Sequence, residues 1–442
     1  MTAAALAVVA AVAVPLAQAS PEERLASSIP GVFELARNQY ARLLEEAEKT
    51  PDRFPRSLRP DGSPRTDSLW GWTSGFFPGL LWQTYAGTGD TAFRDAAARW
   101  TRKFERLRHY DRGHDIGFML MGSYGLGLRY APETVPEARD VLLDGARALM
   151  RRFSPKVGAI RSWNNKRFEH PVIIDNMMNL ELLEWAANHR REKDAGRVAR
   201  AHADTTLRNH FRPDGSAYHV TDYNPDTGRV FARYAWQGAC VDGAWARGQT
   251  WAVYGFTMMC RETGDTNYLA AARRTADFVM NHPNLPADAI PCWDFCFRDG
   301  DGEPRDASAA AVLASALLEM GDILPADEGA RYRAFAVRIL NTLCSDAYLA
   351  KAGENGFFLL RHSTGHKPEN SEVDTPISYA DYYFLEALLR FREIRARDRP
   401  VCGGKPGFSS VSFVSSVPES GTLGITVQFE RKTHEKGKTH ER

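Results

Sequence analysis

The feature that most constrains the fold is an alternation between two kinds of helical stretch. Apolar residues recur at helical spacing between residues 31 and 393, whereas strand-like alternation is scarce. Stretches such as 74–86 are apolar nearly all round, which predicts burial on every side. Stretches such as 91–107 carry one apolar stripe and one charged face, which is typical of an outer helix. The twelve predicted helices are 31–49, 74–86, 91–107, 116–130, 134–152, 174–189, 194–211, 244–262, 266–281, 306–321, 327–345 and 377–393.

A weak internal repeat supports this alternation. Thr88-Gly89-Asp90 joins a buried stretch to an Ala/Arg-rich one, and Thr263-Gly264-Asp265 does the same later in the chain. Six buried and six amphipathic helices in alternation predict an all-α fold, a closed double ring of the (α/α)6 barrel type. The alternative is an open α-solenoid, which would need polar capping repeats.

The longer connections carry most of the chemically useful side chains, and nearly all of them precede a buried helix. In an alternating ring the N-termini of the buried helices share one end, so these segments should converge on a single mouth. The segments are 50–73, 155–173, 212–243, 282–305 and 346–376.

Two aspartates stand out as a candidate acid/base pair. Asp175 follows the apolar run 172–174 and opens a largely buried helix, and Asp115 has a similar setting sixty residues earlier. The simpler interpretation of Asp175 is an N-cap, which a helix dipole would keep ionised. Apolar surroundings and a second carboxylate would instead raise one pKa, so that one group donates a proton and the other stays charged.

Tryptophans and one arginine complete the predicted site. Flat apolar rings are surfaces on which sugars stack, although any single tryptophan is also explained by core packing. Arg247 begins an apolar helix, where an unpaired guanidinium is costly. It should therefore pair with a protein carboxylate such as Asp242 or with an anionic substrate. The tryptophans in or near the predicted mouth are Trp70, Trp72, Trp163, Trp251 and Trp293.

Composition excludes several functions. The formal net charge is +1 and no nucleic-acid-binding motif is present, so we expect no nucleic-acid partner. No phosphate-binding loop, dinucleotide fingerprint or zinc motif occurs, and we expect neither an organic cofactor nor a metal. The six cysteines lack zinc-like spacing; Cys292 and Cys296 could form a disulfide or remain buried thiols, of which we favour thiols.

The two ends of the chain differ from its body. Residues 1–19 are an Ala/Val/Leu run ending Ala17-Gln18-Ala19, which is typical of a secretory signal although the usual basic start is missing. It is too short for a good membrane span, and we expect no membrane partner. Export to the periplasm or medium follows, with a cytoplasmic location as the alternative. Residues 20–398 form the predicted catalytic domain, and the polar segment 399–442 is predicted to be a disordered tail.

Between about residue 30 and residue 395 the chain contains many distinctive motifs in one order. They are Trp72-Thr-Ser-Gly-Phe-Phe-Pro-Gly-Leu-Leu-Trp82, His114-Asp115-Ile-Gly-Phe118, Asp175-Asn-Met-Met-Asn-Leu-Glu-Leu-Leu183, Asp214-Gly-Ser-Ala-Tyr-His219-Val220, Gln237-Gly238, Trp245-Ala-Arg-Gly-Gln-Thr-Trp251, Pro304-Arg-Asp-Ala-Ser-Ala-Ala-Ala311 and Tyr379-Ala-Asp-Tyr-Tyr-Phe-Leu-Glu-Ala-Leu388. In these motifs and their order the chain resembles the unsaturated glucuronyl hydrolases, glycoside hydrolase family 88.

The resemblance implies an (α/α)6 barrel that removes the Δ4,5-unsaturated uronic acid from lyase-generated glycosaminoglycan fragments of the chondroitin, hyaluronan or heparin type. It implies that Asp175 protonates C4 of the vinyl ether and that a water activated by Asp175 adds at C5. Ordinary glycosidases protonate the leaving oxygen instead. It makes Asp115 the second carboxylate, which binds substrate and tunes Asp175.

The resemblance also implies a set of pocket residues, namely Trp72, His114, Trp163, His219, Gln237, Arg247 and Trp251. Ser363 and Lys367 resemble a loop that meets the next sugar, where some members hold a sulfate. This chain departs from that pattern because His366 interrupts it. The alternatives are an unsaturated rhamnogalacturonyl hydrolase acting on pectin fragments, an inverting glycosidase on saturated sugars, and a non-catalytic sugar-binding barrel. We expect a monomer or a weak homodimer.

Overall fold

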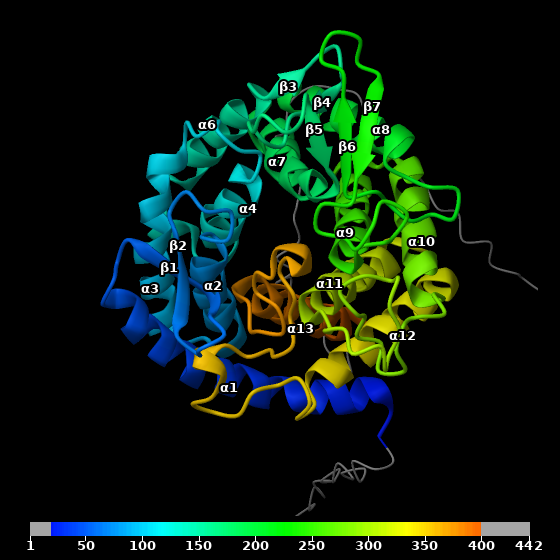
Figure 1. Ribbon diagram of the computed structural model, residues 1–442. Helices are drawn as coiled ribbons and strands as arrows, with labels where there is room; N and C mark the ends of the chain where they lie inside the picture. The colour runs from blue at the N-terminus through cyan, green and yellow to red at the C-terminus, as the bar shows by residue number, and fades with distance from the viewer. Residues whose placement is uncertain (1–18, 399–442) are drawn as a thin grey trace, which may run out of the picture. The chain divides into compact units, whose positions relative to one another are not determined.

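The helices form two concentric rings in the computed structural model, which describes residues 19–398 (Figure 1). The outer ring contains α1 (Pro21–Glu48), α3 (Thr91–Arg102), α6 (Ala138–Met150), α8 (Lys193–Asn209), α10 (Thr266–Met280) and α12 (Ala326–Leu343). The inner ring contains α2 (Phe76–Thr88), α4 (Ile116–Leu120) continued by α5 (Leu126–Tyr130), α7 (Leu180–Arg190), α9 (Ala246–Thr263), α11 (Ala307–Ile323) and α13 (Ser378–Asp398). Helix α13 contacts both α11 and α2, which closes the ring. The fold is the predicted (α/α)6 barrel.

The sequence pattern explains which helix lies inside. Every residue of α11 from Ala307 to Gly321 is buried, as expected for a helix that is apolar all round. Helix α3 buries one stripe and leaves its arginines outside. The repeated Thr-Gly-Asp turns have one geometry: Gly89 and Gly264 adopt positive φ, and Asp90 and Asp265 cap the next helix through their side chains.

Several predicted helix boundaries differ from the structure, three of them at the starts of helices. Helix α1 starts at Pro21, ten residues before the predicted start, because Ser20 and Glu23 form a capping box and Pro30 is accommodated inside the helix. The stretch 134–152 becomes helical only at Ala138, after a 3-10 turn. The stretch 174–189 opens with the 3-10 turn Ile174–Asn179.

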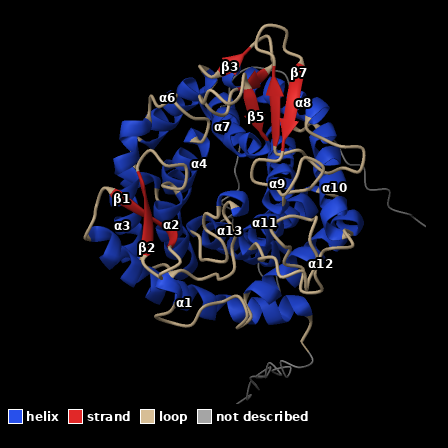
Figure 2. Cartoon of the chain, viewed as in Figure 1, coloured by secondary structure: helices blue, strands red, loops and turns tan. Residues whose placement is uncertain are grey.

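The strands lie in the long connections at one end of the ring (Figure 2). β1 (Arg53–Leu58) pairs with β2 (Pro64–Ser68), and β3 (Phe153–Ser154) pairs with β4 (Ala159–Ile160). β5 (Pro171–Ile173), β6 (Val220–Tyr223) and β7 (Val230–Tyr234) form an antiparallel sheet. These strands belong to the segments that precede inner helices α2, α7 and α9.

The predicted signal and the predicted tail lie almost entirely in parts of the chain that the structure does not describe. Residues 1–18 of the predicted signal and the predicted tail 399–442 lie outside the described residues. Among residues 19–398, no helix has both the length and the apolar character required to cross a bilayer.

Candidate active site

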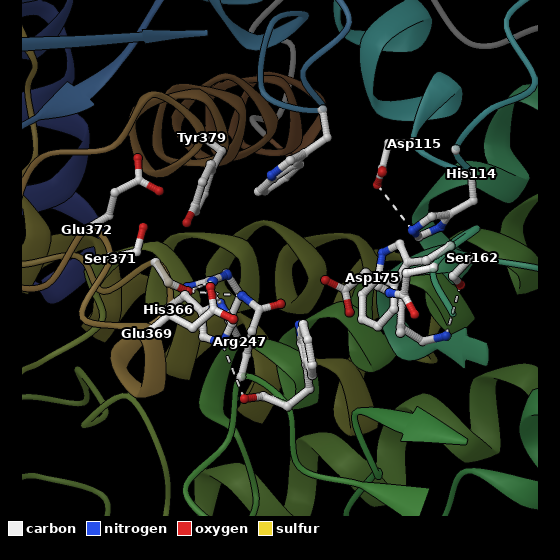
Figure 3. Close-up of a pocket in the computed structure, with 18 of the residues that line it drawn as sticks. His114, Asp115, Ser162, Asp175, Arg247, His366, Glu369, Ser371, Glu372 and Tyr379 are labelled. Atoms are coloured by element: carbon white, nitrogen blue, oxygen red, sulfur yellow. Dashed lines mark hydrogen bonds and ion pairs between the residues drawn. The ribbon is translucent and has the colours of Figure 1, made fainter. Parts of the chain in front are cut away.

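The predicted mouth contains a cavity of about 640 Å³ (Figure 3). Four of the five connecting segments contribute to its walls, and the segment 282–305 does not. The stretch 110–115, before α4, contributes as well. Its lining residues are Arg56, Arg65, Trp72, Tyr110, Arg112, Gly113, His114, Asp115, Ser162, Trp163, Asn164, Asn165, Ile173, Asp175, Trp236, Gln237, Arg247, Gly365, His366, Glu369, Ser371, Glu372 and Tyr379.

Asp175 is placed by the end of β5 and the turn that opens α7. The backbone N–H of Ile174 donates to the carbonyl of His219 at 3.0 Å, which fixes the turn against β6. The Asp175 side chain is only 12% exposed. Its Oδ2 is buried and accepts no hydrogen bond within the described part of the chain, and His219 Nε2 lies 3.5 Å from it.

Asp115 is the residue before α4, and its side chain makes no capping hydrogen bond. His114 Nε2 lies 3.4 Å from Asp115 Oδ1. Figure 3 shows both carboxyls pointing into the same cavity. The structure therefore brings the predicted pair together.

Burial changes the proton affinity of both carboxyls. It raises the pKa of Asp175 to about 7, opposed by the positive charge of Arg247 and reinforced by the charge of Asp115. It raises the pKa of Asp115 to about 7 as well, opposed by Arg152. A carboxyl whose pKa lies near 7 can give a proton and later take one near neutral pH.

The neighbouring histidines do not supply charge. Burial lowers the pKa of His114 to about 3 and that of His219 to about 3. Both rings are therefore neutral near pH 7 and act through hydrogen bonds and packing. The His219 ring lies over Trp245 with centroids 4.4 Å apart, and it does not line the cavity.

Arg247 lines the cavity and is held by a different partner from the one suggested above. Its Nη1 donates to Asp306 Oδ2 at 2.7 Å and to the carbonyl of Thr364 at 2.5 Å, and Nη2 donates to the carbonyl of Gly365 at 2.6 Å. Asp306 precedes α11 and is fully buried. The suggestion of Asp242 is therefore wrong, because Asp306 already occupies Arg247.

The predicted tryptophans divide into two groups. Trp72 and Trp163 line the cavity, and Trp72 packs on Tyr379 with centroids 5.0 Å apart. Trp251 is fully buried, packs against Phe118 and does not line the cavity. Trp70 and Trp293 are also absent from the walls.

The other predicted substrate residues are placed as follows. Gln237 lines the cavity and its side chain donates to the carbonyl of Gly365 at 3.0 Å. Ser363 is fully buried and its backbone pairs with Thr375, away from the cavity wall. Lys367 Nζ lies 3.7 Å from Glu303 Oε2 and does not line the cavity either.

Several wall residues were missed by sequence reasoning. Trp236 is the clearest: it lines the cavity with a positive φ of 51°, an unusual conformation for a bulky residue. The only feature of the sequence that pointed to Trp236 as a wall residue was its position directly before Gln237. Arg56 and Arg65, on β1 and β2, reach Glu372 from far away in the sequence, which no local pattern reveals.

The cysteine prediction is confirmed in part. Cys292 and Cys296 are not bridged, but only Cys292 is buried. Cys296 is exposed, and its sulfur lies 3.8 Å from that of Cys240.

Comparison with known proteins agrees with this geometry. Residues 45–319 match the model of Glycosyl Hydrolase Family 88. The chain belongs to this family. It is therefore a glycoside hydrolase, and its fold is that of the family's solved structures.

Three family members illustrate the similarity. The unsaturated glucuronyl hydrolase of Formosa agariphila is 45% identical over 343 residues, which cover 77% of this chain and 84% of the relative. The crystal structure of an unsaturated glucuronyl hydrolase specific for heparin is 45% identical, with a TM-score of 0.81, covering 84% of this chain and 98% of the other. A variant of the Streptococcus agalactiae enzyme, solved with dGlcA-GalNAc6S, is 26% identical, with a TM-score of 0.70, covering 84% of this chain and 92% of the other.

Proposed function

We propose that this family 88 member releases the Δ4,5-unsaturated glucuronic acid from the non-reducing end of lyase-generated glycosaminoglycan oligosaccharides. The observation that carries the proposal is the pair Asp115 and Asp175, two buried carboxyls with pKa values raised to about 7 in one cavity. The related enzymes act on substrates of this type according to their names, and one is solved with an unsaturated disaccharide.

The reaction begins with a proton transfer from Asp175. Protonated Asp175 gives its proton to C4 of the C4=C5 double bond, and positive charge develops at C5 and the ring oxygen. The Asp175 carboxylate then takes a proton from a water molecule as that water adds to C5. The resulting hemiketal opens and releases the next sugar, so no net proton is consumed. A carboxyl whose pKa lies near neutrality suits both steps.

Asp115 and Arg247 set the proton affinity of Asp175 in this scheme. The charge of Asp115 raises the pKa of Asp175, and the charge of Arg247 lowers it. Trp72, Trp163 and Tyr379 provide the flat walls against which the sugar rings pack.

The test follows the ultraviolet absorbance of the conjugated uronate in unsaturated chondroitin, hyaluronan and heparin disaccharides. Loss of absorbance with the wild-type enzyme supports the proposal. The comparison substrates are an unsaturated rhamnogalacturonyl disaccharide, followed by the same absorbance, and a saturated glucuronide, followed by the sugar that it releases. Preferential turnover of either one would replace the proposal with the corresponding alternative.

Export is part of the proposal and rests on the composition of residues 1–19. N-terminal sequencing of the protein recovered from the periplasm or medium of a producing bacterium tests it. A mature chain beginning near Ser20 supports export. An uncleaved chain found only in the cytoplasm contradicts it.

A further inference from the structure

One exposed arginine lies on a cavity-lining tryptophan and is free to bind an anion. The Arg167 guanidinium lies 4.6 Å from the centroid of the Trp236 ring and 5.9 Å from that of Phe168. Arg167 is exposed and makes no ion pair with any residue of the described part of the chain. Its own segment enters the cavity, because Asn164 and Asn165 line the wall.

Trp236 is held in place by two other segments of the mouth, 155–173 and 346–376. Its ring packs on Trp163 and Phe168 with centroids 5.5 and 5.6 Å apart. His366, from the segment 346–376, has its ring centroid 5.9 Å from that of Trp236 and its Nε2 3.3 Å from the Trp236 carbonyl oxygen. The surroundings therefore hold a bulky residue at positive φ, which places its ring on the wall.

Ser363 and Lys367, which resemble residues that hold a sulfate in some family members, are not placed to do this here. Ser363 is fully buried and Lys367 lies beside Glu303, and neither lines the cavity. Glu369 does line it and adds a negative charge to that loop. The segment that contains Arg167 meets this loop at Trp236, and it offers a guanidinium that makes no ion pair among the described residues.

We propose that Trp236 and Arg167 form a site for the sugar that follows the unsaturated uronate, in which the ring packs on Trp236 and a sulfate ester on that sugar binds Arg167. A guanidinium suits this task because its planar donors match two oxygens of a sulfate at once. The inference rests on the proposed function and specifies which substrates of that class the enzyme prefers.

The first experiment measures kcat/KM for unsaturated chondroitin disaccharides that carry no sulfate, a 4-sulfate or a 6-sulfate. Arg167→Gln should lower kcat/KM by about three- to tenfold for at least one sulfated substrate and leave the unsulfated one unchanged. The matched controls are Lys367→Gln and Arg229→Gln, the latter on the exposed β6–β7 turn. Neither should change the ratio of kcat/KM for a sulfated disaccharide to kcat/KM for the unsulfated one. An equal loss on all three substrates, or no loss, would overturn the role of Arg167.

Trp236 is tested by two substitutions. Trp236→Phe keeps an aromatic wall and should retain most of kcat/KM on every disaccharide, whereas Trp236→Leu should raise KM more than it lowers kcat. Equal behaviour of the two variants would contradict stacking on Trp236.

A binding measurement separates this inference from the proposed function. Calorimetric titration of Asp175→Asn with the same disaccharides reports affinity without turnover. Tighter binding of a sulfated disaccharide that is lost in the double variant with Arg167→Gln supports the site even if wild-type turnover fails. Equal affinities for sulfated and unsulfated ligands would overturn it.

Discussion

The side-chain oxygen Oδ1 of Asn179 accepts a hydrogen bond from the backbone N–H of Phe118 at 2.9 Å. Phe118 lies in α4, three residues after Asp115, and Asn179 ends the turn that contains Asp175. The contact is close because Gly117 has no side chain: a Cβ there would lie 2.5 Å from the Asn179 Cα. This hydrogen bond and the close backbone packing therefore fix the start of α4, which carries Asp115, against the turn that carries Asp175.

Gly117→Ala should separate these elements and reduce activity. A methyl group cannot fit against the Asn179 backbone, so the Asp115 turn must move relative to Asp175. We expect kcat to fall by about 10²-fold, the scale of a displacement near 1 Å in an active site. Gly31→Ala, in α1 with open space around its Cβ, is the control and should leave kcat unchanged. Wild-type kcat in Gly117→Ala would show that this contact does not position the carboxyls.

The pH at which kcat/KM falls on the alkaline side should depend on Asp115. Asp175 must be protonated to donate to C4, so kcat/KM falls as pH rises through its pKa, which burial raises to about 7. The charge of Asp115 contributes to that rise. Asp115→Asn removes this charge, so the pKa of Asp175 falls and the alkaline fall of kcat/KM moves to lower pH. The pH dependence of the residual kcat/KM of Asp115→Asn checks this shift. If the alkaline fall of kcat/KM stays at the same pH or moves to higher pH, the charge of Asp115 does not raise the pKa of Asp175.

Asp175 should also make stability depend on pH. Its folded pKa of about 7 exceeds the ordinary value of 3.8, so folding favours the protonated form. This contribution is complete below about pH 4 and is lost as pH rises to about 7. Asp175→Asn should therefore be more stable than wild type at pH 8, by about 1–3 kcal/mol, and equally stable at pH 4.

Urea denaturation at the two pH values measures this difference. Asp299→Asn, an exposed carboxylate, is the control and should show no such dependence. If Asp175→Asn is less stable than wild type at pH 8, burial does not raise the pKa of Asp175.

Breaking the ion pair beneath the site should destabilise the fold. Asp306 is fully buried and accepts from Arg247, from its own helix at Ser308 and from the backbone of Thr364. Asp306→Ala leaves the buried guanidinium of Arg247 without its carboxylate, which should lower the free energy of unfolding by about 3–5 kcal/mol. Asp299→Ala, at the exposed pair with Arg305, should cost less than about 1 kcal/mol. Chemical denaturation of both variants tests this, and similar losses would exclude a special role for the buried pair.

The helical ring was predictable because its signals are local. Apolar periodicity identified all twelve helices, and the Thr-Gly-Asp turns at 88–90 and 263–265 have the geometry that their residues favour. The topology of an alternating ring then placed Asp115 and Asp175 at one end.

The details of the site depend on contacts that sequence spacing does not encode. The choice of Asp306 over Asp242 as the partner of Arg247 follows from where α11 begins relative to α9. The position of Trp236 on the cavity wall follows from a single positive φ. Trp251 and Ser363 are residues of types that often bind sugars, but both are fully buried. Trp251 is buried by the packing of α9, and Ser363 by the backbone pairing with Thr375.

The most direct test of the central claim compares wild type with Asp175→Asn on an unsaturated glucuronyl disaccharide, following the ultraviolet absorbance of the conjugated double bond. Asn has nearly the same shape but cannot donate or accept the proton. The account predicts that wild type removes the absorbance and that Asp175→Asn is slower by at least about 10³-fold while still binding the disaccharide. Turnover by Asp175→Asn at a rate close to wild type would contradict the account.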